Sequence, residues 1–232
     1  MEGAPMKPTI KLAETTAPDG ANFSLYEHDG EFTFYLEKWP VMSTKMTYSE
    51  LMLADLGCQW KDGRTAVRIL IGGLGLGFTL RRCLEINGPK AVCEVAEILP
   101  DVIKWNHELL NGLNDEILAD RRTLITRGDV YDCIKRAADG GPKYDAILLD
   151  VDDGPSSLIQ PQNWQLYGGS GLSALQRALT KGGRAAFWAA EAEPKLMKSL
   201  RKAGFHAEEV AVAGHERTRK KIHRIYVAEM PV

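Results

Sequence analysis

From residue 65 onward the chain alternates apolar runs of strand length with segments of helical spacing. The apolar runs TAVRILIGG, KAVCEVAE, RTLITRGD, KYDAILLD and GRAAFWAA are separated by stretches such as FTLRRCLEIN and VYDCIKRAA. Short apolar runs are typical of strands buried on both faces, and helical spacing is typical of the helices that cover them. The alternation therefore predicts an α/β fold with a mostly parallel sheet, right-handed crossovers and helices on both faces.

The end of the chain breaks this alternation. HAEEVAVAG and IHRIYVAE both have strand character, and the polar segment GHERTRKK joins them without a helix. Parallel neighbours need a long crossover, whereas a short connection joins antiparallel strands. We therefore expect the last strand to insert antiparallel into the sheet.

The part of the chain before the alternation is smaller and differently patterned. Residues 1–20 are rich in Pro, Ala and Thr and are predicted to be a flexible arm. Within residues 21–60, two aromatic-rich alternating runs flank Asp29-Gly30, which predicts a β-hairpin. A short apolar helix follows, with Thr47 and Glu50 spaced as a capping box. Residues 61–232 form the main α/β domain in this division.

Composition and charge exclude several classes of protein. The net charge is −2, so no global field would recruit nucleic acid or an anionic membrane. No apolar run reaches the roughly 18 residues needed to cross a bilayer, and the first 20 residues lack a signal-peptide core. The 4 cysteines and 5 histidines show no metal-ligand spacing. We expect a cytoplasmic protein with no metal ion, no membrane and no nucleic-acid partner.

A glycine-rich loop is the first candidate for chemistry. Gly73, Gly75 and Gly77 lie between a predicted strand and a predicted helix, and Glu97 follows 20 residues later at the end of the next strand. Glycines allow close approach of a ligand, a helix N-terminus offers free N–H groups, and the acid can accept from ribose hydroxyls. The combination predicts a nucleoside site. The alternative is a turn that serves only helix–sheet packing.

The identity of the nucleoside can be narrowed from the same loop. The dinucleotide fingerprint Gly-x-Gly-x-x-Gly, started at Gly73, would place its last glycine at Phe78. A bulky residue there disfavours close packing over a pyrophosphate. The pattern therefore favours a nucleoside without phosphate, such as S-adenosylmethionine, over NAD(P).

Two further strands end in aspartates. Asp129 follows the third strand, where it could accept from an adenine amino group, cap the next helix, or do both. Asp150 ends the fourth strand, at the edge where open α/β sheets bind ligands. Transfer from a sulfonium to an amine needs alignment and removal of an ammonium proton. Asp150 and Asp153 could hold a cationic acceptor and take that proton, whereas Asp152 is expected to lie in a solvated turn. The alternative for Asp153 is that it belongs to the same turn.

Taken in order, the motifs resemble those of the spermidine synthase-like, or polyamine aminopropyltransferase, family. GGLGLGFTLRR, AEILPDVIKWN, RGDVYDCIK and YDAILLDVDDGP carry the resemblance, which covers about residues 45–190. It implies the Rossmann-like seven-stranded fold of class I S-adenosylmethionine-dependent methyltransferases, with decarboxylated S-adenosylmethionine as the donor substrate and a small-molecule amine as the acceptor. A homodimer is implied by analogy alone.

The resemblance also implies a role for each matching residue. The donor nucleoside would be held by three loops that follow successive strands. These are the glycine loop with Gly73, Gly75 and Gly77, then Glu97, and then Gly128 with Asp129. Asp150 would be the catalytic base. The acceptor would be bound by Asp153 together with Tyr48 and Glu50.

The chain also departs from the family pattern. Leu76 stands where these enzymes carry an acid in the glycine loop, and Ser49 stands where they carry a histidine between Tyr48 and Glu50. The N-terminal β-domain looks reduced to one hairpin, and the segment after Asp153 differs. Aminopropyl transfer to a small cationic amine is the expected activity. A methyltransferase that uses intact S-adenosylmethionine on a small molecule is the alternative, and a nucleoside sensor without catalysis is a third possibility.

Overall fold

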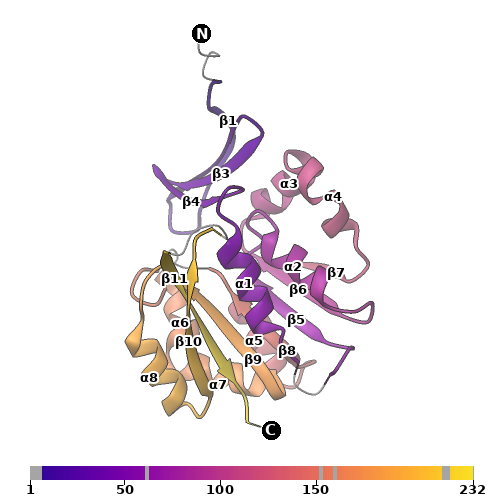
Figure 1. Cartoon of the computed structure of the whole chain (residues 1–232), viewed down its shortest axis with the longest axis vertical. Helices are drawn as coiled ribbons and strands as arrows, with labels where there is room; N and C mark the ends of the chain where they lie inside the picture. The colour runs from indigo at the N-terminus through magenta and orange to yellow at the C-terminus, as the bar shows by residue number, and fades with distance from the viewer. Residues whose placement is uncertain (1–6, 61–62, 152–153, 159–160, 216–219, 232) are drawn as a thin grey trace.

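The strands in the described part of the chain form two sheets (Figure 1). The computed structural model describes residues 7–60, 63–151, 154–158, 161–215 and 220–231. An N-terminal antiparallel sheet has the order β1-β2-β3-β4, and a larger sheet has the order β10-β11-β9-β8-β5-β6-β7. The N-terminal sheet comprises β1 (Ile10–Thr16), β2 (Asn22–His28), β3 (Glu31–Leu36) and β4 (Trp39–Ser43).

The large sheet confirms the predicted α/β class. Strands β5 to β9 pair in parallel, and β11 runs antiparallel between β9 and β10, as expected for the last strand. Its strands are β5 (Arg68–Gly72), β6 (Val92–Glu97), β7 (Thr123–Arg127), β8 (Tyr144–Leu149), β9 (Leu179–Ala189), β10 (His206–Ala213) and β11 (Lys221–Glu229). The helices are α1 (Tyr48–Gly57), α2 (Phe78–Ile86), α3 (Pro100–Glu108), α4 (Asn111–Ala119), α5 (Val130–Ala138), α6 (Trp164–Tyr167), α7 (Gly169–Ala178) and α8 (Pro194–Lys202), with a 3₁₀ turn at Pro161–Asn163.

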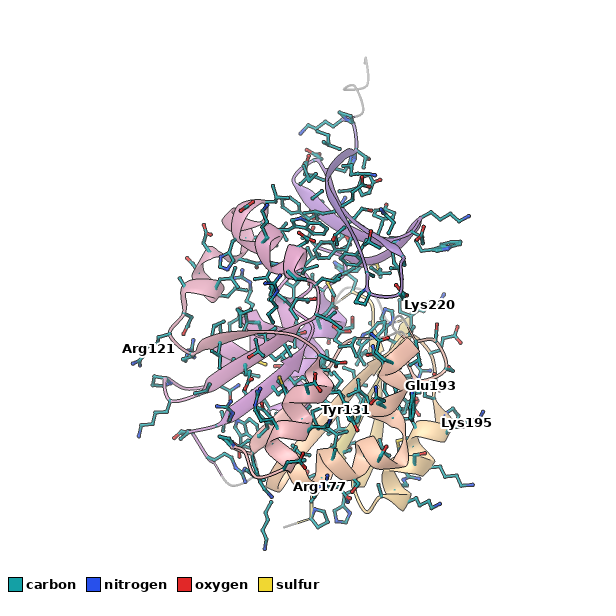
Figure 2. The ribbon with its side chains drawn as sticks, turned by 180° about the vertical axis from the view of Figure 1, so that it is seen from behind. Arg121, Tyr131, Arg177, Glu193, Lys195 and Lys220 are labelled. Atoms are coloured by element: carbon teal, nitrogen blue, oxygen red, sulfur yellow. The ribbon has the colours of Figure 1, made fainter. Side chains whose placement is uncertain are left out.

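Each face of the large sheet has its own apolar core. Along β8 every residue is buried, and Leu148 packs into the core on one face while Ile147 packs into the core on the other. The first core is shared with α1, α2 and α3, and the second with α5, α7 and α8. Figure 2 shows the second face, with Tyr131 on α5 and Arg177 on α7. Burial on both faces explains why these strands are continuous apolar runs.

The N-terminal region differs from its prediction. The expected hairpin is present, since β2 and β3 pair across Asp29-Gly30. However, the prediction of a loose arm over residues 1–20 is wrong for Ile10–Thr16, which pairs with β2 as strand β1. The sheet also extends beyond the predicted hairpin, because β4 adds a further strand. Both added strands lie at the edges of this sheet, where weak patterning and register shifts hide them from sequence inspection.

Packing joins the two sheets through aromatic rings. Phe23 of β2 stacks on Trp105 of α3, with ring centroids 6.3 Å apart and an interplanar angle of 1°. Phe34 of β3 lies 6.0 Å from the same ring. Trp105 is thus a packing residue, and it fixes the N-terminal sheet beside the helix that follows β6.

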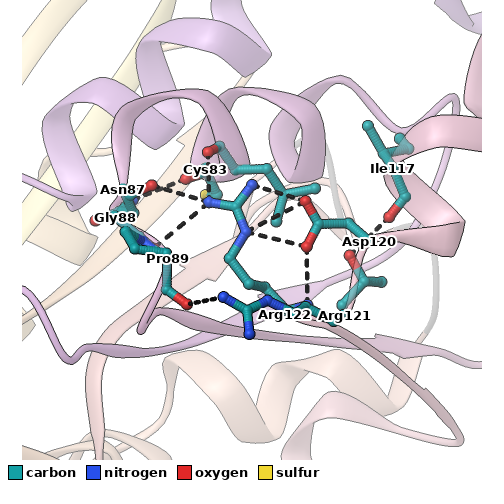
Figure 3. Close-up of polar contacts among 10 residues, drawn as sticks. Cys83, Asn87, Gly88, Pro89, Ile117, Asp120, Arg121 and Arg122 are labelled. Atoms are coloured by element: carbon teal, nitrogen blue, oxygen red, sulfur yellow. Dashed lines mark hydrogen bonds and ion pairs between the residues drawn. The ribbon is translucent and has the colours of Figure 1, made fainter.

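The Arg122 side chain caps the C-terminal end of α2 (Figure 3). The Arg122 guanidinium donates to the carbonyl oxygens of Leu84 and Asn87 at 2.8 and 2.9 Å, and it is paired with the Asp120 carboxylate at 2.7 Å. The last carbonyls of a helix have no partner within the helix, so this side chain satisfies groups that would otherwise lack one. The guanidinium also lowers the pKa of Asp120 to about 2.

We therefore expect Arg122→Met to destabilise the fold by about 1–3 kcal/mol, because it leaves buried carbonyls unpaired. Urea unfolding at pH 7 measures this. The pKa of Asp120 lies below its ordinary value, so the ion pair contributes fully above about pH 5 and is lost as pH falls toward 2. The difference between parent and variant should shrink over that range, and a difference that stayed constant would contradict the assigned ion pair.

No helix in the described part of the chain is both long enough and apolar enough to cross a membrane. Within the same residues, His, Cys, Asp and Glu side chains form no group of three or more that could hold a metal ion.

Candidate active site

A cavity of about 480 Å³ opens between the carboxyl ends of the parallel strands and the N-terminal sheet. Its walls come from the loops after β5, β6, β7 and β8, from the start of α1, and from β3 and β4. Open α/β sheets bind their ligands at this edge because the strand order reverses there and leaves a crevice. The cavity is thus the place to look for the predicted site residues.

The glycine loop lines the cavity, and each glycine has a physical reason to be there. Gly73, Gly75 and Gly77 all have positive φ values, of 87°, 50° and 84°. A Cβ atom on Gly75 would lie 2.6 Å from the Met42 sulfur, and one on Gly77 would lie 2.9 Å from the Asn114 side chain. The packing alternative therefore holds in part for Gly77, which faces helix α4. Lining of the cavity by all three glycines is consistent with the predicted nucleoside loop.

Two buried asparagines hold this loop in place. Asn106 donates to the Gly75 carbonyl oxygen at 2.9 Å, and Asn114 donates to the Leu76 carbonyl oxygen at 3.1 Å. The two side chains also bond to each other at 2.5 Å, and both are fully buried. Sequence reasoning missed them. One feature of the sequence could have identified them. Each is an asparagine inside an apolar helical stretch, where this residue is unfavourable unless its side chain forms a hydrogen bond with the backbone.

Glu97 is buried beneath the loop. Its carboxylate accepts hydrogen bonds from the backbone N–H groups of Leu74 and Leu99, each at 2.8 Å. Burial raises the pKa of Glu97, and these backbone donors act in the opposite direction. The side chain ties the glycine loop to the start of α3 and also lines the cavity. Its contact with a ribose stays a prediction.

Asp129 caps a helix, which is one of the two roles that its position in the sequence allows. It is the N-cap of α5, and its carboxylate accepts from the Tyr131 N–H at 2.8 Å. Gly128 precedes it with φ 144° and donates its N–H to the Glu97 carbonyl oxygen at 2.9 Å. Both residues line the cavity, so the predicted adenine contact can accompany the capping role.

Asp150 follows β8 directly and lines the same cavity, half-buried. Asp150 thus lies at the carboxyl end of its strand and beside the cavity, and its role as the base stays a prediction. Asp152 and Asp153 lie outside the described residues.

The two predicted acceptor-binding residues at the start of α1, Tyr48 and Glu50, lie in different surroundings. Ser49 and Glu50 are buried in the cavity wall, and the Ser49 hydroxyl donates to the Glu50 carboxylate at 2.6 Å. Burial raises the pKa of Glu50. Tyr48, which the structure describes, is half-buried and is not one of the lining residues. The predicted capping box is wrong, since the Thr47 side chain makes no capping bond with the described residues.

Aromatic residues from two neighbouring strands complete the wall. Trp188 of β9 and His223 of β11 both line the cavity, with ring centroids 4.9 Å apart. Sequence reasoning assigned neither to the site, because strand pairing rather than sequence proximity brings them together. Tyr167 packs instead on Phe187 at 6.1 Å, and Trp164 is 60% exposed and does not line the cavity.

The segment after the aspartates is attached to α8. Glu193, buried at the start of that helix, accepts from the Ser156 N–H at 3.0 Å and from the Ser156 hydroxyl. Figure 2 shows Glu193 close to Lys195, on the side of the molecule where α8 lies. The described part of this segment thus has a defined anchor.

Comparison with known proteins agrees with this geometry. No family model matches the chain. Polyamine aminopropyltransferase 1 of Hyperthermus butylicus is 32% identical over 150 residues, which cover 62% of this chain and 50% of that protein. The polyamine aminopropyltransferase of Pyrobaculum islandicum is 30% identical over 94 residues, or 40% of this chain and 32% of that protein. The chain spans half the length or less of both curated relatives.

Solved structures extend the likeness over nearly the whole chain. Spermidine synthase from Thermotoga maritima has a TM-score of 0.71 at 16% identity, with 94% of this chain and 72% of that chain covered. The chain has a spermidine synthase-like fold. A spermidine synthase in complex with the transition state analogue AdoDATO gives a TM-score of 0.69 at 15% identity over the same shares. The spermidine synthase-like resemblance inferred from the motifs, and the Rossmann-like seven-stranded fold with it, are thus confirmed.

Proposed function

We propose that the chain transfers an aminopropyl group from decarboxylated S-adenosylmethionine to the amine of a small acceptor. One observation carries this proposal. The charged side chains that line the cavity include Glu50, Glu97, Asp129 and Asp150, and among the described residues neither Lys nor Arg lines it. Such a wall suits a ligand that carries positive charge, as a sulfonium with an ammonium tail does. The names of the curated relatives support the same activity.

In the proposed reaction the acceptor nitrogen attacks the carbon of the aminopropyl chain that is bonded to sulfur. A new carbon–nitrogen bond forms, and the carbon–sulfur bond breaks. Its electron pair stays on sulfur, which becomes the neutral thioether of methylthioadenosine. Asp150 takes the proton from the acceptor ammonium and so makes the lone pair available. The reaction therefore needs only the donor, the acceptor amine and a group that takes the proton.

The remaining residues bind and orient the two substrates. The glycine loop and Glu97 would hold the ribose end of the donor, and Asp129 with Gly128 would contact the adenine. Glu50, which lines the cavity, would hold the acceptor amine. Asp153 keeps the acceptor role that the resemblance implies, whereas a role for Tyr48 lacks support because its side chain is outside the cavity wall.

Methyl transfer from intact S-adenosylmethionine is the second candidate. Leu76 favours it, because this buried apolar residue lines the cavity at the loop position where the family carries an acid for an ammonium group. However, the intact donor brings a carboxylate into a cavity whose described charges are mostly acidic. The like charges make this candidate the weaker of the two.

A donor comparison distinguishes the two candidates. We expect decarboxylated S-adenosylmethionine to bind at least about tenfold more tightly than the intact donor, since that factor corresponds to roughly 1.4 kcal/mol of avoided repulsion. Titration calorimetry measures both affinities, with methylthioadenosine as the reference for the shared nucleoside. Tighter binding of the intact donor would overturn the aminopropyl proposal in favour of methyl transfer.

A further inference from the structure

The cavity has a second wall whose chemistry differs from that of the acidic one. The N-terminal sheet and the segment after it contribute Phe34, Leu36, Trp39, Met42 and Met46, among other residues. The lining residues between positions 17 and 46, a stretch that is described throughout, include Ser43 as their one polar side chain and carry no charge. A ligand that extends from the carboxylates toward this wall therefore leaves charged surroundings for apolar ones.

The apolar surface continues from this wall onto the glycine loop. The Met42 sulfur lies 3.2 Å from the Leu76 nitrogen and accepts a hydrogen bond from its N–H group. Leu76 itself is 1% exposed and lines the cavity. A thioether is a weak acceptor and an adaptable apolar group, so this contact offers a ligand surface area and little charge stabilisation.

The mouth of the cavity is also apolar. Trp39 is 68% exposed and Met46 is 46% exposed, although both line the cavity. The Met46 methyl group lies beside Gly214. A Cβ atom on Gly214 would lie 2.9 Å from this methyl group and 2.7 Å from the Cδ1 atom of Ile222. Large exposed apolar side chains at the rim of a pocket are typical of a binding surface for an apolar group.

From these observations, and resting on the proposed function, we infer that the acceptor is a monoamine with an apolar body, not a diamine or polyamine. Its single ammonium group would lie at Asp150 and Glu50, and its hydrocarbon part would lie against Met42, Leu76 and Met46. A second ammonium group on the same ligand would be moved from water to an uncharged wall, which is strongly unfavourable. The charge complementarity of the two walls thus defines the class of substrate.

Two probes of equal length test this inference. 1-Aminopentane and 1,4-diaminobutane each have six heavy atoms and differ at the far end, where one has a methyl group and the other an ammonium group. Calorimetry on the protein saturated with methylthioadenosine gives their affinities without turnover. We expect 1-aminopentane to bind at least about tenfold more tightly, and lengthening the monoamine to gain roughly fourfold per methylene until the wall is covered. Preference for the diamine, or no binding of either amine, would overturn the inference.

A matched pair of variants assigns the preference to the wall. Met46→Glu places a carboxylate at the rim and is expected to reduce the preference for 1-aminopentane by about tenfold. Leu124→Glu makes the same change at a 47% exposed position on β7, away from the cavity, and is expected to leave the preference unchanged. An unchanged preference in Met46→Glu would exclude this wall as its cause.

Turnover separates this inference from the proposed function. With decarboxylated S-adenosylmethionine present, release of methylthioadenosine reports transfer to each amine. Transfer that favours the diamine would contradict the inference and leave aminopropyl transfer standing. Absence of transfer, combined with tighter binding of the monoamine, would support the inference on substrate class and contradict the proposed reaction.

Discussion

Asp150→Asn is expected to lower kcat by roughly 10²–10⁴-fold, the range of a general base, with little change in donor affinity. The amide has nearly the same shape as the carboxylate but cannot accept the acceptor's proton. Asp150 lies at the end of β8 in the wall of the cavity, so the substitution removes the proposed proton acceptor without opening a space. Turnover assays should show this fall in kcat, and calorimetry should show that methylthioadenosine still binds as tightly as in the parent.

Asp132→Asn is the matched control for this variant. Asp132 is an exposed aspartate in the first turn of α5 and does not line the cavity. It should keep parental kcat and stability. If Asp150→Asn turned over donor and amine at the parental rate, Asp150 would not be the base and the proposed mechanism would have to be abandoned.

Glu97→Gln is expected to weaken donor binding by at least about tenfold and to destabilise the fold by about 1–3 kcal/mol. Both carboxylate oxygens of Glu97 accept backbone N–H groups, from Leu74 and Leu99. An amide offers one acceptor and directs N–H groups at the second donor, so one buried backbone group loses its partner. The glycine loop and the start of α3 would then shift relative to each other. Calorimetry with methylthioadenosine and urea unfolding measure the two effects.

Glu108→Gln controls for the loss of a carboxylate in the same region. Glu108 is 60% exposed and lies 3.9 Å from Lys104 on the surface of α3, where ion pairs contribute little. Its variant should bind donor and unfold as the parent does. Parental donor affinity in Glu97→Gln would contradict the assignment of this acid to the nucleoside.

The position of the site could be predicted from sequence because of how parallel strands are arranged. Glu97, Asp129 and Asp150 each follow an apolar run, and the carboxyl ends of parallel strands meet at one edge of the sheet. Recognising the strands was therefore enough to bring these acids together. The same argument placed the glycine loop after the first strand of the large sheet, and the structure places all of them around one cavity.

Features that depend on pairing between distant segments could not be predicted in this way. Strand β1 has few apolar residues, so its pattern does not predict a strand, and its pairing with β2 joins segments that the sequence separates. Trp188 and His223 meet because β9 pairs with β11. The bonds from Asn106 and Asn114 to the glycine loop cross from α3 and α4 to another part of the chain. Helix and strand patterns carry no information on such contacts.

A local rule failed at the start of α1. Thr47 and Glu50 have the spacing of a capping box, yet the Thr47 side chain makes no capping bond with the described residues, and the Glu50 carboxylate accepts from the hydroxyl of its neighbour Ser49. Sequence rules for helix termini assume that the acid is available to the backbone. The same carboxylate is buried in the cavity wall, and functional sites are places where local preference and global arrangement disagree.

Product analysis with decarboxylated S-adenosylmethionine labelled in its aminopropyl carbons tests the central claim most directly. The parent protein is incubated with this donor and 1-aminopentane, and in parallel with methyl-labelled intact donor. Transfer of the aminopropyl label to the amine, with one methylthioadenosine formed per transfer, is the predicted result. Transfer of the methyl label to the amine, with S-adenosylhomocysteine as the co-product and no movement of the aminopropyl label, would contradict it.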